Sequence, residues 1–187
     1  MFIAIGLAVI VAVFLIVVAA RPNAFRVERS TTIAAPAEGI FGLINDLQSW
    51  ASWSPYEKLD PNTKHKFERP RQGVGASCSW AGNSKVGEGK MTIVDSKPFE
   101  RVTMRLDFVK PFKGTNQGQF TLRPDANGVG VTWSMSGETG FICKMFSMFM
   151  NMDRMIGKEF ENGLADMKRV AEAAVPVAAA RALRRAA

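Results

Sequence analysis

The sequence predicts an α+β domain in which an antiparallel sheet with one apolar face packs against a long C-terminal helix. Residues 152–174 carry apolar side chains at steps of three and four, which gives a helix one apolar face. Residues 64–136 form short alternating runs separated by turn residues, a pattern typical of an antiparallel meander. About 150 residues remain once the apolar beginning and the Ala/Arg-rich end of the chain are set aside, which is enough for one domain with its own core.

Residues 1–20 contain no charged side chain, and their length matches a lipid bilayer, so they are predicted to form a transmembrane anchor. The alternative is a cleaved signal peptide, because residues 18–20 end in small side chains. The run lacks a basic segment before it and is longer than the apolar part of a signal peptide, which favours the anchor. Arg21, Arg26 and Arg29 follow at once, so the positive-inside rule predicts a single-pass protein with its domain on the cytoplasmic side.

Residues 21–24 are expected to be a linker to the domain, which begins with an alternating strand at 25–34. Pro36 suits a first helical turn, and apolar residues at helical spacing predict a short helix to about residue 47. A second short turn brings Trp50 and Trp53 to the same face. The Ser-Pro-Tyr sequence at 54–56 is expected to stop any helix there.

Six further strands are predicted in series, at residues 64–68, 76–80, 88–95, 101–108, 117–123 and 129–136. Their alternation makes one face of the sheet apolar and the other polar. The face expected to point at the helix carries Trp80, Met91, Ile93, Met104, Leu106, Phe108, Phe120, Leu122, Val131, Trp133 and Met135.

The long helix at 152–174 has Asn151 as a suitable N-cap and Asp153 in its first turn, where the helix dipole favours a negative charge. Gly163 lies near the middle of its apolar face, where glycine leaves a gap in the packing. We therefore expect a ligand or a closely packed strand to approach Gly163. Residues 175–187 are expected to form a frayed basic Ala/Arg tail.

The net charge is +7 and the pI is about 9.7, which favours an acidic partner such as an anionic lipid. Nucleic acid is not expected as a partner, because the sequence has no basic stripe with interleaved aromatics, no zinc-finger spacing and no helix-turn-helix motif. Cys78 and Cys143 form no CxxC motif and are interpreted as small buried hydrophobes.

The order of these elements resembles the START and polyketide cyclase-like (SRPBCC) superfamily over residues 25–173. The matching stretches are FRVERS at 25–30, IAAP at 33–36, WASWSP at 50–55, GVGA at 73–76 and IGKEFENGL at 156–164. The resemblance implies a helix-grip fold over residues 25–174, with a curved sheet around the C-terminal helix. It also implies an apolar cavity between sheet and helix that holds lipids, polyketides or other hydrophobic molecules, and similar members often begin with one membrane span.

Reactive constellations are scarce, and we predict no catalytic residue, no metal site and no cofactor. His65 is the only histidine and lies on an apparently exposed strand between two lysines, which argues against a catalytic role. Acidic residues fall mainly on the polar sides of the strands, so no carboxylate pair is nominated.

The leading functional prediction is therefore a membrane-anchored binder or carrier of a hydrophobic small molecule or lipid, with residues 1–20 as the membrane contact and the oligomeric state left open. A cyclase or dehydratase that uses the same cavity, and a co-chaperone-like module that binds proteins, are the alternatives. The Met- and Phe-rich segment 141–151 is expected to be a mobile gate over the cavity mouth, and the alternative is that it is ordinary core between the last strand and the long helix. The predicted ligand-binding residues are Trp53, Tyr56, Trp80, Met91, Met104, Phe108, Phe120, Trp133, Met135, Met152, Ile156, Phe160 and Gly163.

Overall fold

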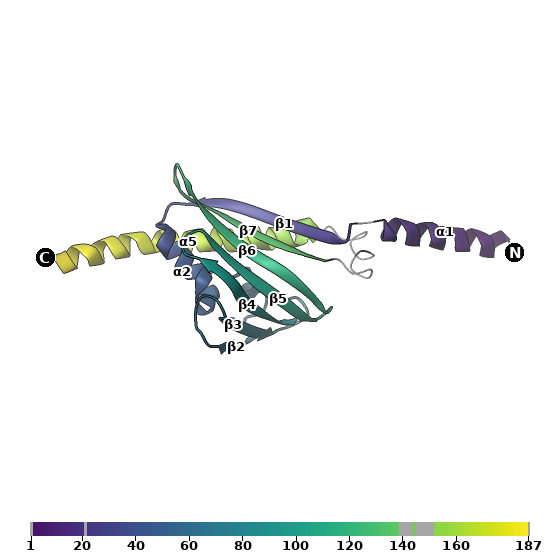
Figure 1. Cartoon of the computed structure of the whole chain (residues 1–187), viewed down its shortest axis with the longest axis horizontal. Helices are drawn as coiled ribbons and strands as arrows, with labels where there is room; N and C mark the ends of the chain where they lie inside the picture. Colours follow the sequence, from purple (N-terminus) through teal and green to yellow (C-terminus); the bar gives the residue numbers. More distant parts are fainter. Residues whose placement is uncertain (1, 21, 139–143, 145–151, 187) are drawn as a thin grey trace.

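The structure, a computed structural model, describes residues 2–20, 22–138, 144 and 152–186. Figure 1 shows a curved sheet with the long last helix along one face, α1 extending from one end and the end of the last helix extending from the other. The elements are α1 (Phe2–Ala19), β1 (Ala24–Ile33), α2 (Ala37–Asn45), the 3₁₀ helix η1 (Leu47–Ser52), α3 (Pro55–Leu59), β2 (Lys64–Glu68), β3 (Ser77–Ala81), β4 (Glu88–Lys97), β5 (Arg101–Lys110), β6 (Gly114–Asp125), β7 (Gly128–Glu138) and α5 (Met152–Ala186).

The seven strands form one antiparallel sheet in the order β1-β7-β6-β5-β4-β3-β2. Each strand from β2 to β6 pairs with the next one in the chain, which confirms the predicted meander. β1 closes the far edge by pairing with β7, from Ala24 opposite Glu138 to Ile33 opposite Val129. This is the α+β, helix-grip arrangement that the sequence predicts.

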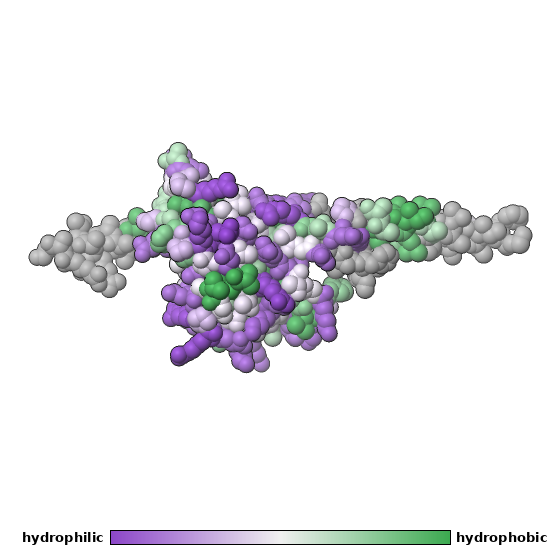
Figure 2. All heavy atoms as spheres, in the orientation of Figure 1, coloured by the Kyte–Doolittle hydropathy of each residue, from purple (hydrophilic) through white to green (hydrophobic). Residues whose placement is uncertain are grey.

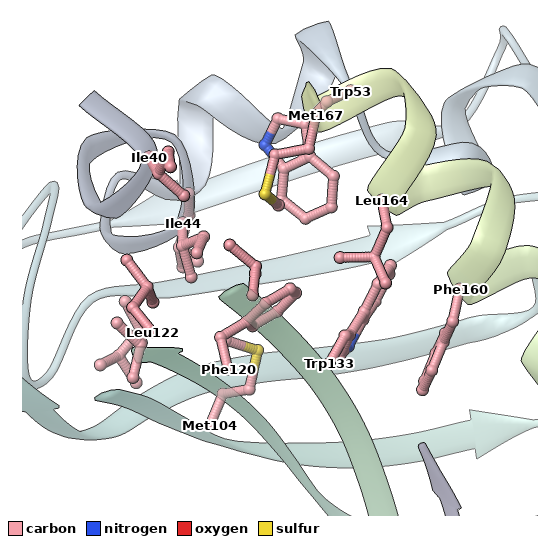
Figure 3. Close-up of a cluster of buried hydrophobic side chains, with 14 of the residues drawn as sticks. Ile40, Ile44, Trp53, Met104, Phe120, Leu122, Trp133, Phe160, Leu164 and Met167 are labelled. Carbon is pink, nitrogen blue, oxygen red and sulfur yellow. The ribbon is translucent and has the colours of Figure 1, made fainter. Parts of the chain in front are cut away.

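The core lies between the sheet and the helices α2 and α5 (Figure 3). Phe160, Leu164, Met167 and Ala171 are buried, so the apolar face of α5 is the one that the spacing predicts. Figure 3 shows Ile40 and Ile44 of α2 and the α5 residues over the same group of strand side chains. That group includes Met104, Phe120, Leu122 and Trp133, all from the predicted inward face.

Arg29 on β1 forms hydrogen bonds with residues in the first part of α5. Its guanidinium donates to both carboxylate oxygens of Asp153, at 3.0 and 2.9 Å, and to the Glu161 carboxylate at 2.7 Å. These hydrogen bonds raise the pKa of Arg29 and lower that of Asp153. A Cβ on Gly157 would stand 2.1 Å from the guanidinium, so this glycine leaves the room in which Arg29 crosses the helix. Arg29 is therefore a packing residue of the inward face of β1, a role that the sequence analysis did not predict.

Two local predictions were wrong. Pro55 does not stop a helix but opens α3, because proline lacks only an N–H that is unpaired anyway in the first turn. The prediction of a frayed tail at 175–187 was also wrong up to Ala186, because α5 continues through Pro176 to that residue. The Ala- and Arg-rich composition has high helix propensity and continues the helix.

The apolar residues 2–19 form α1, and Val13 and Ile16 are exposed on it. Figure 2 shows apolar surface along the described part of α1 and a mainly polar surface over the visible face of the domain. Within the residues that were described, no helix has the length and apolar character needed to cross a membrane. The predicted span at residues 1–20 is thus not supported by the structure.

Candidate functional site

A cavity of about 410 Å³ opens between the sheet and the short helices η1 and α3. Its size falls within the range of pockets that hold one small organic molecule. Its walls come from η1, α3, the strands β2 to β5 and β7, and one residue of α5. The lining residues are Leu47, Gln48, Trp50, Ala51, Ser54, Tyr56, Glu57, Thr63, His65, Phe67, Cys78, Trp80, Val86, Met91, Met104, Leu106, Phe108, Trp133, Met135 and Phe160.

A cluster of aromatic rings closes the cavity on the side of α5. Trp133 stacks on Phe160 with ring centroids 4.1 Å apart and planes 10° apart, and on Phe120 at 4.9 Å. The Trp50 and Trp53 rings meet Trp133 edge-on at 6.1 and 5.7 Å. Each indole N–H is satisfied by a backbone carbonyl of α2, Trp50 by Ile44 at 3.0 Å and Trp53 by Leu43 at 2.9 Å. This wall is therefore held by stacking and by hydrogen bonds that fix both indoles.

Gly163 sits directly over this aromatic cluster. A Cβ at this position would lie 2.8 Å from a ring carbon of Trp133 and 2.8 Å from Cδ of Pro55. The expected close approach to Gly163 is confirmed. The approaching groups are the side chains of Trp133 on β7 and Pro55 at the start of α3. Because Gly163 has no side chain, α5 packs close to the sheet at this position. Gly163 is not among the residues that line the cavity.

Eight of the thirteen predicted site residues line the cavity, namely Tyr56, Trp80, Met91, Met104, Phe108, Trp133, Met135 and Phe160. Trp53 and Phe120 are instead fully packed core residues, with exposed fractions of 1% and 0%. Ile156 packs against the core beside the cavity, and the side chain of Met152 lies outside the part described. The predicted gate at 141–151 also lies outside the described residues, apart from Lys144, as does Cys143.

One wall of the cavity is polar. The His65 Nε2 and Glu57 Oε1 atoms are 3.0 Å apart, and the other ring nitrogen, Nδ1, lies 3.7 Å from the Cys78 sulfur. Burial raises the pKa of the Cys78 thiol to about 11, and the Glu57 carboxylate adds to this shift. Cys78 is therefore a neutral thiol at physiological pH, and the Glu57 carboxylate and the His65 imidazole are its ionisable neighbours on this wall.

Tyr56 lines the same cavity from the neighbouring position on α3. Burial, helped by the negative charge of Glu159, raises the pKa of its phenol, so the hydroxyl stays protonated. No described residue forms a hydrogen bond with this hydroxyl, and no buried side-chain oxygen or nitrogen in the described part lacks a partner. The Tyr56 hydroxyl must therefore face accessible space, as a donor that no protein group occupies.

Sequence reasoning missed His65 and Glu57 for two different reasons. His65 was interpreted as lying on an exposed strand between Lys64 and Lys66, and β2 is indeed exposed along its length. The His65 side chain, 28% exposed, nevertheless lines the cavity. The spacing of two between His65 and Phe67, which both line the cavity, is the pattern that could have placed it on the inner face. Glu57 lies on α3, a helix that was not predicted.

A comparison with protein families matches residues 24–172 to the model described as "Polyketide cyclase / dehydrase and lipid transport". No curated protein matches the sequence. Among solved structures, the chain is similar to protein CV1439 from Chromobacterium violaceum, with 17% identity and a TM-score of 0.57 over 81% of this chain and 99% of that one.

A second similar structure is the di-domain ARO/CYC BexL from the BE-7585A biosynthetic pathway, with 14% identity and a TM-score of 0.60. The match covers 83% of this chain and 52% of that two-domain protein. A third is the Aha1 dimer from Colwellia psychrerythraea, with 15% identity and a TM-score of 0.54 over 79% and 96% of the two chains. At these identities the likeness shows the fold alone, whereas the family match spans most of the sequence: the chain belongs to the polyketide cyclase / dehydrase and lipid transport family.

Proposed function

We propose that this protein binds one hydrophobic small molecule or lipid in the cavity beneath η1 and α3, and holds or carries it there. The observation that carries the proposal is the cavity of about 410 Å³ with mainly apolar and aromatic walls. Such a cavity gains free energy when an apolar ligand replaces the water in it. Four methionine or cysteine side chains on its walls, Met91, Met104, Met135 and Cys78, are soft enough to adapt to different ligand shapes.

A pair of variants on β5 tests this proposal. Leu106 lines the cavity, whereas Val109 on the same strand is 51% exposed and does not. Leu106→Trp should fill the cavity and weaken binding of the neutral apolar dye Nile red at least tenfold, while Val109→Trp should bind it as the natural protein does. Equal binding by all three proteins, measured by dye fluorescence, would place the dye elsewhere and contradict the proposal.

Natively purified protein offers a second measurement. Organic extraction followed by mass spectrometry should release an apolar molecule from the natural protein and much less from Leu106→Trp. Recovery of the same molecules from both proteins in equal amounts would indicate surface adsorption, and the proposal would then be wrong.

An enzyme in the same cavity is the second candidate, because Glu57 and His65 place a proton-exchanging pair against apolar walls. The reaction class that such a pair serves is removal and return of a proton next to a ketone carbonyl, which is the first step of aldol cyclisation and dehydration. Deuterium exchange into 2-tetralone in D₂O, followed by NMR, tests this candidate. Deuterium exchange that is faster than in buffer alone and is lost in His65→Gln would favour an enzyme. Exchange at the rate of buffer alone would contradict this candidate and favour the carrier.

We further propose that residues 1–20 attach the domain to a membrane and that the domain lies on the cytoplasmic side. The support is the absence of charge in residues 1–20 and the three arginines, Arg21, Arg26 and Arg29, that follow. Alkaline carbonate washing should leave the protein in the membrane pellet, and release of full-length protein would refute the attachment. A reporter fused after Ala187 that is active only outside the cytoplasm would refute the orientation.

A further inference from the structure

The charged groups around the cavity determine which head group a ligand can carry. Among the described lining residues there is no lysine and no arginine, and the carboxylate of Glu57 already faces His65 at 3.0 Å. A ligand carboxylate or phosphate in the cavity would lose its hydration without gaining a cationic partner. The cavity therefore disfavours anionic ligands.

The Cys78 thiol and the Tyr56 phenol, both on the cavity wall, have raised pKa values, so a negative charge is disfavoured at both groups. Burial raises the pKa of the Cys78 thiol, and the Glu57 carboxylate adds to this shift. Burial likewise raises the pKa of the Tyr56 phenol, with a smaller contribution from the Glu159 carboxylate. In both cases a nearby carboxylate opposes a further negative charge. Of these two carboxylates Glu57 lines the cavity, so a bound anion would meet the same repulsion from it.

Tyr56 supplies the polar contact that an uncharged ligand can use. Its hydroxyl is a donor in accessible space, has no hydrogen-bond partner among the described residues, and belongs to a side chain that lines the cavity. A neutral carbonyl or hydroxyl oxygen accepts such a hydrogen bond, and a pure hydrocarbon does not.

We propose that the cavity selects an uncharged, mostly apolar molecule whose carbonyl or hydroxyl oxygen accepts a hydrogen bond from Tyr56, and discriminates against carboxylate-bearing lipids of similar size. This selectivity rests on the proposed binding function and goes beyond it by assigning the recognition to one side chain. The Glu57–His65 pair excludes the anion, and Tyr56 recognises the oxygen.

Three probes on one scaffold test the assignment by calorimetry with the full chain: fluorene, 9-fluorenone and fluorene-9-carboxylate. The natural protein should bind 9-fluorenone about threefold to tenfold more tightly than fluorene, the gain from one hydrogen bond. It should bind the carboxylate most weakly of the three. Tyr56→Phe should remove the preference for the ketone and leave the affinity for fluorene unchanged, because only the hydroxyl is lost.

Glu57→Gln provides the complementary variant. It should narrow the gap between 9-fluorenone and the carboxylate, because it removes a negative charge while keeping a side chain of the same shape. Thermal melting of both variants confirms that they fold.

The possible outcomes separate this assignment from the proposed function. Binding of fluorene and 9-fluorenone with equal affinity, an unchanged ketone preference in Tyr56→Phe, or tightest binding of the carboxylate would each overturn the assignment while the binding function stands. Failure of all three probes to bind the natural protein would overturn the proposed function and the assignment together.

Discussion

Two parts of the sheet carry the same alternating apolar pattern, one under α5 and the other under α3. The space between sheet and helix is filled with side chains under α5 and is hollow under α3. Under α5, Phe160 and Leu164 meet Trp133 and Phe120 in a closed cluster (Figure 3). Under η1 and α3, the side chains of β3, β4 and β5 face a cavity. The difference lies in the covering element, since α3 is a helix of five residues that cannot span the strands below it.

An inward apolar residue on this sheet is therefore a core residue or a cavity residue according to which element opposes it. Gly163 brings α5 close enough to fill the space over Trp133. Nothing equivalent in the described residues brings α3 close to β4 and β5. Changes in the filled part should therefore alter stability, whereas changes in the hollow part should alter binding.

Truncating one phenylalanine in each part should give the largest difference in stability between the filled and the hollow part. Phe120→Ala, at a position with no exposed surface, should lower the free energy of unfolding by about 3–5 kcal/mol in urea titrations. Phe108→Ala, at a half-buried position on the cavity wall, should cost about 1 kcal/mol and weaken binding of Nile red. Equal losses of stability would show that the cavity is packed as tightly as the cluster.

Filling the cavity with ligand should stabilise the hollow part of the domain more than the filled part. At a free ligand concentration 100 times the dissociation constant, the natural protein should gain about 2.7 kcal/mol of stability. Hydrogen exchange should slow in β2, β3 and α3, which border the cavity, more than in residues 160–171 of α5. Uniform slowing in all of these segments would contradict a local site.

A larger side chain at Gly163 should destabilise the filled part, by less than the Phe120→Ala substitution does. Gly163→Leu should cost about 1–3 kcal/mol, because its side chain would collide with Trp133 and Pro55. Gly42→Leu in α2 is the matched control, since a Cβ at Gly42 meets no atom within 4 Å. The control should be neutral or gain up to about 1 kcal/mol from helix propensity. Melting curves that rank the two variants in the reverse order would refute the close approach.

The smallest effect is expected where α5 meets β1, at the Arg29–Asp153 pair, in which Arg29 is partly buried and Asp153 is exposed. Hydrogen bonding to Arg29 lowers the pKa of Asp153 below its ordinary value of 3.8, so the pair stabilises the fold above that pH and loses its effect as the pH falls through the lowered pKa. Arg29→Gln should therefore be less stable than the natural protein at pH 6, and the difference should shrink toward pH 2. Arg26→Gln, which removes an ion pair within β1, controls for the change in net charge. A stability difference for Arg29→Gln that does not vary with pH would mean that the charge pair is not its source.

Most of the sheet could be predicted from the sequence because strand alternation is a local property. The predicted strand at 64–68 matches β2 at both ends, and the other strands differ by a few residues at their termini. The buried face of α5 followed from spacing in the same way. Pro55 misled the prediction because proline both ends helices and begins them, and only the neighbouring turns decide between the two.

The site was harder to predict, because it depends on contacts between distant segments. Trp53 and Phe120 are the same residue types as Trp80 and Phe108, yet the first two are packed and the last two line the cavity. His65 became a site residue only when α3 placed Glu57 beside it. A single sequence does not contain the position of α3 over β2, so neither the polar wall nor the free hydroxyl of Tyr56 could be anticipated.

The edge position of β1 also has a consequence for the order of assembly. β1 is the first strand to be synthesised, but its partner β7 is the last, and every other strand lies between Ala24 and the residue it pairs with, Glu138. Bringing such distant segments together carries a large loop-closure entropy, which slows folding. The local hairpins from β2 to β7 can form before that cost is met. We therefore expect β1 to join the sheet as its final strand, with Val27 and Ile33, buried in the finished domain, in contact with solvent until then.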